Sequence, residues 1–188
     1  MAPDAYDIRT GPAYEADRPA LLSRLAGAVE HLRVDLGSGL VLVFATGETL
    51  RTALEETLRV ERAREGDDDR MLTQVGAFGG LAPGPSRLAA TLVIDLADPV
   101  ALADRLAELP GLGENVSLEV AGARLPATAG AAGDGSGAIH LLFEPDQELR
   151  AILLSGGPVA VVVDHPGCHL RVDLRPDQLA AASADLRP

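Results

Sequence analysis

The sequence predicts an α+β protein with a mostly antiparallel sheet and helices packed largely on one face. Two observations lead to this class. Apolar residues recur at helical spacing in some segments and gather in short β-rich runs in others, several of them joined by glycine-containing turns typical of hairpins. Helices and strands also follow one another irregularly, without the strict alternation of a parallel doubly wound sheet.

The length of 188 residues is enough for one domain with a core and too short for two domains of ordinary size. We therefore expect a single domain over residues 1–188, with short flexible ends at about 1–12 and 176–188. Nearly half of the residues are apolar, but with no Trp, two Tyr and three Phe the core is expected to be aliphatic.

The first half of the chain predicts two helices around a hairpin. Leucine and alanine spacing indicates a helix over 18–33, with Pro19 in its first turn. Residues 34–44 carry Gly37-Ser38-Gly39 between two apolar runs, which favours a hairpin. A second helix is expected from Thr46 to about residue 65, followed by a short helix through 75 and a Gly/Pro-rich connection.

The second half predicts short strands interrupted by helices. Asp98-Pro99 has the form of an N-cap followed by a proline at the first helical position. The expected elements are strand 88–96, a helix from 98 to before 110, strands 116–120 and 123–127, an Ala/Gly loop over 129–137, strand 139–143, helix 146–154, strands 159–163 and 170–174, and a frayed helix from 176.

The charge of the chain limits its partners. Sixteen basic residues, all of them arginine, stand against 28 acidic residues, for a formal net charge of −12. Such an acidic surface repels phosphate backbones and anionic lipids, so we expect neither nucleic acid nor membrane as a partner. The absence of lysine also excludes Schiff-base and phosphate-loop lysine chemistry.

The compartment follows from a few sequence features. No apolar run approaches the roughly 18 to 20 residues that span a bilayer, and the amino terminus lacks a signal-peptide pattern. The single cysteine, Cys168, excludes an intrachain disulfide. We therefore expect a cytoplasmic protein.

The segment His165-Pro166-Gly167-Cys168-His169 holds two imidazoles and a thiol, which are ligands for zinc or iron. On a straight strand the two histidines would lie about 13 Å apart, too far for one metal ion, so only a turn at Pro166-Gly167 would let the segment converge. Cys168 next to His169 also allows a cysteine nucleophile, although neighbours on a strand point to opposite faces. A structural role is favoured over both.

His140 lies in an apolar strand, where a hydrogen-bonded structural histidine is the more common interpretation. If His140 and His165 lie on neighbouring strands, with Glu56 or Glu61 from the helix above, they form a carboxylate and histidine site suited to iron or zinc. No cofactor beyond this iron or zinc is expected.

The second helix carries a dense charged stretch of Glu56, Arg59, Glu61 and Arg62. Three interpretations stay open: a solvated helical face, a surface that binds a partner or ligand, or an ion-pair network inside a pocket.

Several short segments, in this order and spacing, resemble one bacterial family. They are Tyr14-Glu15-x-x-Arg18-Pro19, Phe44, Glu56-x-x-Arg59-x-Glu61-Arg62, Leu81-x-Pro83, Ala90-Thr91-Leu92 and Asp164-His165-Pro166. The chain from about Tyr14 to His165 thereby resembles the family of domain of unknown function 3501. That family has no assigned activity. Its members are often encoded beside rubrerythrin-like non-haem iron proteins and iron–sulfur proteins, so the resemblance implies an accessory role near redox chemistry.

The chain departs from the family pattern at three polar positions. Gly37-Ser38-Gly39 replaces a Gly-Pro-His turn, Ala53 and Glu55 replace glutamines, and Gly79 or Gly80 replaces an asparagine. If those polar residues form a site in relatives, this chain has lost part of it.

Three hypotheses about function follow. The first is a non-catalytic accessory or subunit protein that binds another protein, such as a rubrerythrin-like non-haem iron redox enzyme, in a homo- or hetero-oligomer. The alternative is a metal-dependent enzyme or small-molecule-binding protein whose site uses His140, His165 and the face formed by Glu56 and Arg59. The third is a degenerate paralogue that mainly stabilises a hetero-oligomer.

Overall fold

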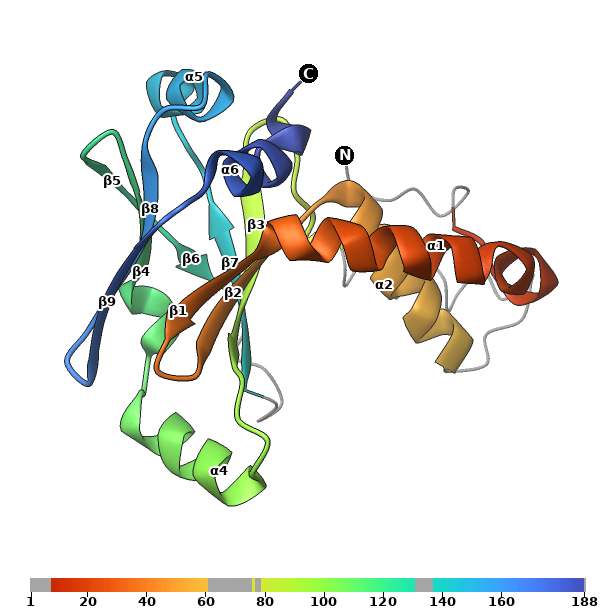
Figure 1. The fold of residues 1–188 in the computed structure, drawn as a ribbon, viewed down its shortest axis with the longest axis horizontal. Helices are drawn as coiled ribbons and strands as arrows, with labels where there is room; N and C mark the ends of the chain where they lie inside the picture. The colour runs from red at the N-terminus through yellow and green to blue at the C-terminus, as the bar shows by residue number, and fades with distance from the viewer. Residues whose placement is uncertain (1–7, 61–75, 77–78, 131–136, 188) are drawn as a thin grey trace.

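The computed structural model of the chain describes residues 8–60, 76, 79–130 and 137–187. The α+β class is confirmed, because the described strands pair antiparallel and helices surround them (Figure 1). The strands divide between two sheets, a division that the sequence did not predict. The first sheet has the order β1 (Arg33–Gly37), β2 (Leu40–Ala45), β3 (Leu88–Ile94), β7 (Ala138–Phe143) and β6 (Thr128–Ala129), and the second β5 (Ala123–Pro126), β4 (Val116–Val120), β8 (Val159–His165) and β9 (Cys168–Asp173).

The core lies between the two sheets. Leu40, Leu42 and Phe44 alternate along β2 toward it, and Leu118 and Val161 meet them from the second sheet. All five are at most 1 % exposed, and they belong to one continuous apolar cluster. The two sheets therefore share a single core, which is mostly aliphatic as the composition predicts.

Helices cover three sides of this pair of sheets. The long helices α1 and α2 lie on the side of the first sheet that faces away from the second (Figure 1). Leu153 and Leu179 close one end of the core, and Leu109 and Leu112 close the other. The described helices are α1 (Gly11–Leu32), α2 (Gly47–Val60), α4 (Pro99–Glu108), η2 (Leu112–Asn115), α5 (Gln147–Leu154), α6 (Pro176–Ala182) and η3 (Ala184–Leu186).

The predicted hairpins form because their turns suit the antiparallel geometry. Between β1 and β2, Gly37, Ser38 and Gly39 all have positive φ, at 83°, 53° and 74°. Only glycine adopts this conformation without strain, so the two glycines make the tight turn possible. The Gly122 hairpin joins β4 to β5, and a turn at Pro166-Gly167 joins β8 to β9.

The first helix begins earlier than predicted. It starts at Gly11 with Pro12 in its first turn, and Pro19 lies inside it. A proline in a helix interior lacks the N–H that would donate to the carbonyl four residues earlier, which is why the prediction started the helix there. The helix continues through Pro19 because Tyr14 and Leu21, on either side of it, are buried against the rest of the protein.

The C-terminal helix is not frayed as the sequence predicted. Leu179 and Leu186 are 5 % and 0 % exposed, and Gln178 Nε2 donates to the carbonyl of Arg33 at 2.6 Å. Asp185 Oδ2 accepts from the backbone N–H of Gly47 at 2.7 Å. The end of the chain thereby binds the start of β1 and the start of α2, so the expectation of a flexible end over 176–188 is wrong for residues 176–186.

Parts of three predictions lie outside the described residues. These are the end of the second helix with its short successor, the middle of the Ala/Gly loop, and most of the predicted flexible N-terminal end. None of the described helices combines the length and the apolar character needed to cross a membrane.

Candidate functional site

The outer face of the first sheet, the face turned away from the core, is mostly apolar. Register pairs place Val43, Thr91 and His140 side by side across β2, β3 and β7. Across these three strands the rest of the outer face consists of Val41, Ala45, Ala89, Val93, Ala138 and Leu142, and the edge strands β1 and β6 add the exposed residues Arg33, Asp35 and Thr128. An antiparallel sheet that faces water normally presents polar residues there, so the composition indicates a covered face.

A cavity of about 380 Å³ separates this outer face from the two long helices. Val29 of α1 and Leu50 and Ala53 of α2 line it on one side, and Val43 and His140 line it on the other. Its volume falls within the range of about 300–1,000 Å³ that small-molecule sites occupy. Because its described lining is apolar apart from a few groups, it has the composition of a ligand site.

The polar groups of the cavity floor are Thr91 and His140. Thr91 Oγ1 lies 3.1 Å from His140 Nδ1, and both residues are half-buried. Among the described residues, Nε2 of His140 has no hydrogen-bond partner. The imidazole is thus oriented through one nitrogen while its second nitrogen is available.

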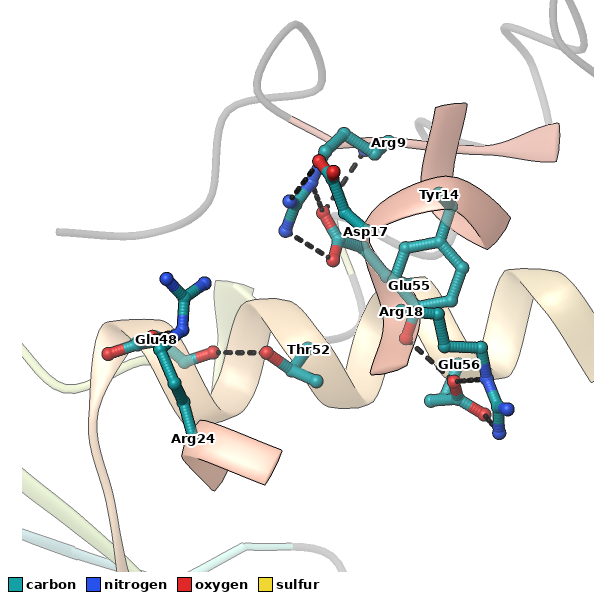
Figure 2. A network of polar contacts seen from close by, with 9 residues as sticks. All are labelled: Arg9, Tyr14, Asp17, Arg18, Arg24, Glu48, Thr52, Glu55 and Glu56. Carbon is teal, nitrogen blue, oxygen red and sulfur yellow. Dashed lines mark hydrogen bonds and ion pairs between the residues drawn. The ribbon is translucent and has the colours of Figure 1, made fainter. Parts of the chain in front are cut away.

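The helices above the cavity are tied together by a buried carboxylate. Glu55 of α2 accepts hydrogen bonds from Arg9 at three donors, the backbone N at 3.1 Å, Nε at 3.0 Å and a terminal guanidinium nitrogen at 2.9 Å (Figure 2). The Glu55 side chain is fully buried, and Asp17 binds the other terminal nitrogen of Arg9 at 3.3 Å. This arrangement joins the segment that precedes α1 to the middle of α2.

A second carboxylate, Glu56, joins α1 to α2. Tyr14 OH and Arg18 Nε each donate to its Oε1 at 2.6 Å (Figure 2). The hydrogen bonds from Arg18 and Tyr14 lower the pKa of the Glu56 carboxyl, and burial opposes only part of that effect. Burial also raises the pKa of the Tyr14 hydroxyl, so Tyr14 stays a neutral donor. We call the Glu55 and Glu56 contacts together the helix clasp.

The four residues predicted to bind a partner or ligand differ in what the structure shows of them. Glu56 lies in the helix clasp, and Arg59 Nε donates to Glu15 of α1 at 2.7 Å. Both side chains therefore serve contacts between α1 and α2 rather than standing free on a solvated face. Glu61 and Arg62 lie outside the described residues.

His165 has a structural environment. Its side chain is buried, Nδ1 accepts from the backbone N–H of Gly167 at 3.0 Å, and Nε2 donates to the carbonyl of Pro110 at 2.9 Å. Because Nδ1 accepts, the proton is on Nε2. Both ring nitrogens are engaged, and the residue ties the β8–β9 turn to the segment after α4.

The other predicted ligands do not converge with His165. Cys168, opposite His165 in the hairpin, is buried, whereas His169 is exposed and binds Asp164 Oδ1 at 2.9 Å. His140 lies in the first sheet and His165 in the second, so the condition on which the site of His140, His165 and Glu56 or Glu61 depended, neighbouring strands, is not met. In the part of the chain that the structure describes, no group of three or more His, Cys, Asp or Glu side chains is placed to hold a metal ion.

Sequence reasoning missed the cavity and the partner of Glu55. It treated His140 as one member of a metal site and overlooked Thr91, although Thr91 stands within the Ala90-Thr91-Leu92 segment on which the family resemblance rests. One signal was available: β3 reads LAATLVI, apolar at nearly every position, which is typical of a strand covered on both faces.

The comparisons place the chain in a family. Residues 4–186 match the family described as protein of unknown function (DUF3501), and the chain belongs to that family. Its fold is similar to the crystal structure of a novel protein of unknown function from Burkholderia pseudomallei, with 26 % sequence identity, a TM-score of 0.90, and coverage of 98 % of this chain and 99 % of that one. No curated protein matches the sequence.

Proposed function

We propose that this protein binds a small, mainly apolar molecule in the cavity between the helices α1 and α2 and the outer face of the first sheet. One observation carries the proposal: an apolar sheet face holds a single oriented imidazole, His140, whose Nε2 has no partner among the described residues. A few precise polar groups in an apolar cavity are the usual design of small-molecule sites.

The proposal favours holding the molecule over transforming it. Of the described side chains that line the cavity, His140 is the titratable one, and Thr49 and Thr91 are the other polar ones. General acid–base or nucleophilic chemistry normally pairs such a group with a second base, acid or nucleophile. The described lining offers His140 a threonine hydroxyl as its orienting partner, and no carboxylate or thiol.

A larger cavity of about 510 Å³ between α1 and α6 is a weaker candidate. Its wall includes Ala28, Ala181 and Ala184, and the polar groups His31 and Asp177 at its rim already bind each other at 3.0 Å. Small apolar side chains with satisfied polar neighbours provide little to recognise a ligand.

The test is binding of a neutral apolar dye, N-phenylnaphthylamine, followed by its fluorescence. Ala53→Trp fills the cavity from the exposed side of α2, and we expect it to weaken dye binding at least tenfold. Ala103→Trp is the matched control, because Ala103 is an exposed alanine on α4, away from the cavity. Equal dye binding by the wild type, Ala53→Trp and Ala103→Trp would refute the proposal.

A second proposal is the accessory role, in which the protein binds another protein such as a rubrerythrin-like non-haem iron redox enzyme. The specific observation that supports it is α4, which has no fully buried side chain and carries Val100 at 69 % exposure. Figure 1 shows this helix projecting at the end opposite to α5 and α6. The predicted docking residues Glu56 and Arg59 support it less, because they bind α1.

Purification of the tagged protein from its host, followed by identification of bound proteins and iron, tests this second proposal. We expect a non-haem iron protein in stoichiometric amount, and its loss in a Val100→Asp variant. Val60→Asp is the control, since Val60 is 71 % exposed at the end of α2. If no iron protein is retained, or if Val100→Asp retains as much as Val60→Asp, the role of α4 is refuted.

The proposals include a cytoplasmic location. It is supported by the single cysteine, Cys168, which is buried and cannot form the intrachain disulfide that stabilises small secreted domains.

A further inference from the structure

Either Thr91 or His140 can be the donor in the hydrogen bond between them. Which of the two donates decides whether Nε2 of His140 offers a donor or an acceptor to a ligand in the cavity. The Thr91 hydroxyl has one proton to donate and can also accept. A neutral imidazole has one N–H and one bare nitrogen. The 3.1 Å contact between Thr91 Oγ1 and His140 Nδ1 therefore has two possible directions.

In the first direction Thr91 donates to Nδ1, and the imidazole proton sits on Nε2. Both Thr91 and Nδ1 are then satisfied, and a single group, the Nε2–H, remains without a partner among the described residues. In the second direction Nδ1–H donates to Thr91. That choice leaves two groups without a partner, the hydroxyl proton and the bare Nε2.

The first direction is favoured because it leaves one polar group rather than two without a partner among the described residues, and each such group costs free energy once a ligand excludes water from the cavity. His140 consequently presents an N–H donor to the cavity. The group that completes this site is a hydrogen-bond acceptor.

The charge of the side chains that line the cavity further restricts the class of ligand. No Asp, Glu, Arg or Lys side chain is among the described residues that line it. Among these described residues a carboxylate ligand would find no cation to offset its desolvation, and the net charge of −12 would oppose its approach. An ammonium ligand would likewise find no carboxylate among them. A neutral ligand meets neither penalty.

Small side chains beside the imidazole leave room for the acceptor. Ala45 and Ala89 form a cross-strand pair on the outer face, two positions along from Val43 and Thr91, and both line the cavity. A ring can lie over these alanines while its polar substituent reaches His140.

We infer that the ligand of this cavity is a neutral, mainly hydrocarbon molecule with one carbonyl-type acceptor, which receives the Nε2–H of His140. The inference rests on the proposed function, since it specifies the chemistry of the same cavity. The carbonyl-type acceptor is a feature of the ligand that the apolar walls of the cavity would not recognise by themselves.

A series of molecules on one skeleton tests it: tetralin, its ketone, its alcohol, its carboxylate and its amine, each measured by displacement of N-phenylnaphthylamine. With the wild type we expect the ketone to bind about tenfold more tightly than tetralin, the size of one hydrogen bond. The carboxylate and the amine should bind more weakly than tetralin.

Two variants separate the donor from the ring. His140→Phe keeps a ring and removes the N–H, so the ketone should fall to the affinity of tetralin while tetralin itself is unchanged. His140→Gln keeps an N–H donor and should restore part of the preference for the ketone. If His140→Phe fails to fold, His140→Gln still tests the role of the N–H donor.

The outcomes distinguish the two levels of the proposal. If tetralin displaces the dye but the alcohol, the carboxylate or the amine binds best, or if the ketone keeps its advantage in His140→Phe, the acceptor inference is wrong and the apolar site stands. The proposed function itself fails if none of the five molecules displaces the dye from the wild type and the dye binds Ala53→Trp as tightly as the wild type.

Discussion

The outer faces of the two sheets differ sharply although both sheets are antiparallel. On the second sheet, Arg171 binds Glu119 and Asp173 at 2.9 and 2.8 Å, and Asp164 binds Arg124 at 3.4 Å, all of them exposed side chains. On the first sheet the equivalent face is apolar across β2, β3 and β7 except for the Thr91 and His140 pair, and it carries charge at the edge strand β1, where Arg33 binds Asp95 at 2.9 Å.

The difference shows which surface the protein leaves to water. The charged side chains of the second sheet satisfy each other and the solvent, so that face needs no cover. The apolar outer face of the first sheet is stable only when something covers it, and α1 and α2 do so incompletely because a cavity remains beneath them. The helix clasp therefore holds the helices that cover the first sheet, and the described residues on the outer face of the second sheet form no equivalent contact.

Removing one ion-pair partner from each side gives the largest contrast. Glu55→Ala leaves Arg9 without its buried carboxylate and loosens α2, so we expect a loss of about 3 kcal/mol in the free energy of unfolding. Arg171→Ala removes an exposed partner of Glu119 and Asp173 and should leave the unfolding midpoint unchanged. Urea denaturation of both variants measures the contrast, and equal losses would contradict it.

A new charge on each outer face gives a smaller contrast. Leu142→Asp places a carboxylate among the apolar residues of the cavity, and we expect a loss of about 2 kcal/mol in stability together with loss of dye binding. Val162→Asp should be tolerated, because Val162 lies directly across from Arg171 in the second sheet. Thermal unfolding and dye fluorescence of the two variants check this, and a tolerated Leu142→Asp would show that the first outer face is not covered.

Lowering the pH should weaken the helix clasp, and the expected change in the free energy of unfolding is the smallest of the three predicted changes. The pKa of Glu56 is lowered in the folded protein, so its stabilising contribution is fully present above the unfolded pKa near 4.5 and is lost as the pH falls through the lower folded pKa. Glu56 is partly exposed, which limits this contribution to about 1 kcal/mol. Unfolding midpoints between about pH 7 and pH 3 should fall less in Glu56→Gln than in the wild type, and parallel curves would rule this out.

Local patterns predicted the local parts of the fold. The hairpins at Gly37-Ser38-Gly39 and Gly122 and the N-cap at Asp98 depend on residues within a few positions of each other, and the structure contains all three. The division into two sheets depends on long-range pairing: β3 pairs on one side with β2, which precedes it in the sequence, but on the other side with β7 and not with β4, the next strand along the chain. Periodicity carries no information on such partners.

The candidate site was harder to predict for the same reason. Thr91 and His140 are 49 residues apart in the chain, and Arg9 and Glu55 are 46 apart. His165 and His140 were predicted as metal ligands because an imidazole can coordinate zinc or iron. The residues that surround each histidine, however, come from distant segments of the chain. Only the folded chain distinguishes His165, with both nitrogens hydrogen-bonded, from His140, one nitrogen of which has no partner in the described part of the chain.

The segment 176–186 closes the core through contacts that are distant in the sequence. Leu179, Ala182 and Leu186 pack into the core, and Gln178 and Asp185 bind β1 and α2, which lie 145 and 138 residues earlier in the chain. Contacts of such separation depend on the rest of the fold, because the entropy of closing the long loop between them has to be offset. Local detachment of this segment would therefore uncover the interior between the two sheets while their strands stay paired, which is the form that a protease would attack first.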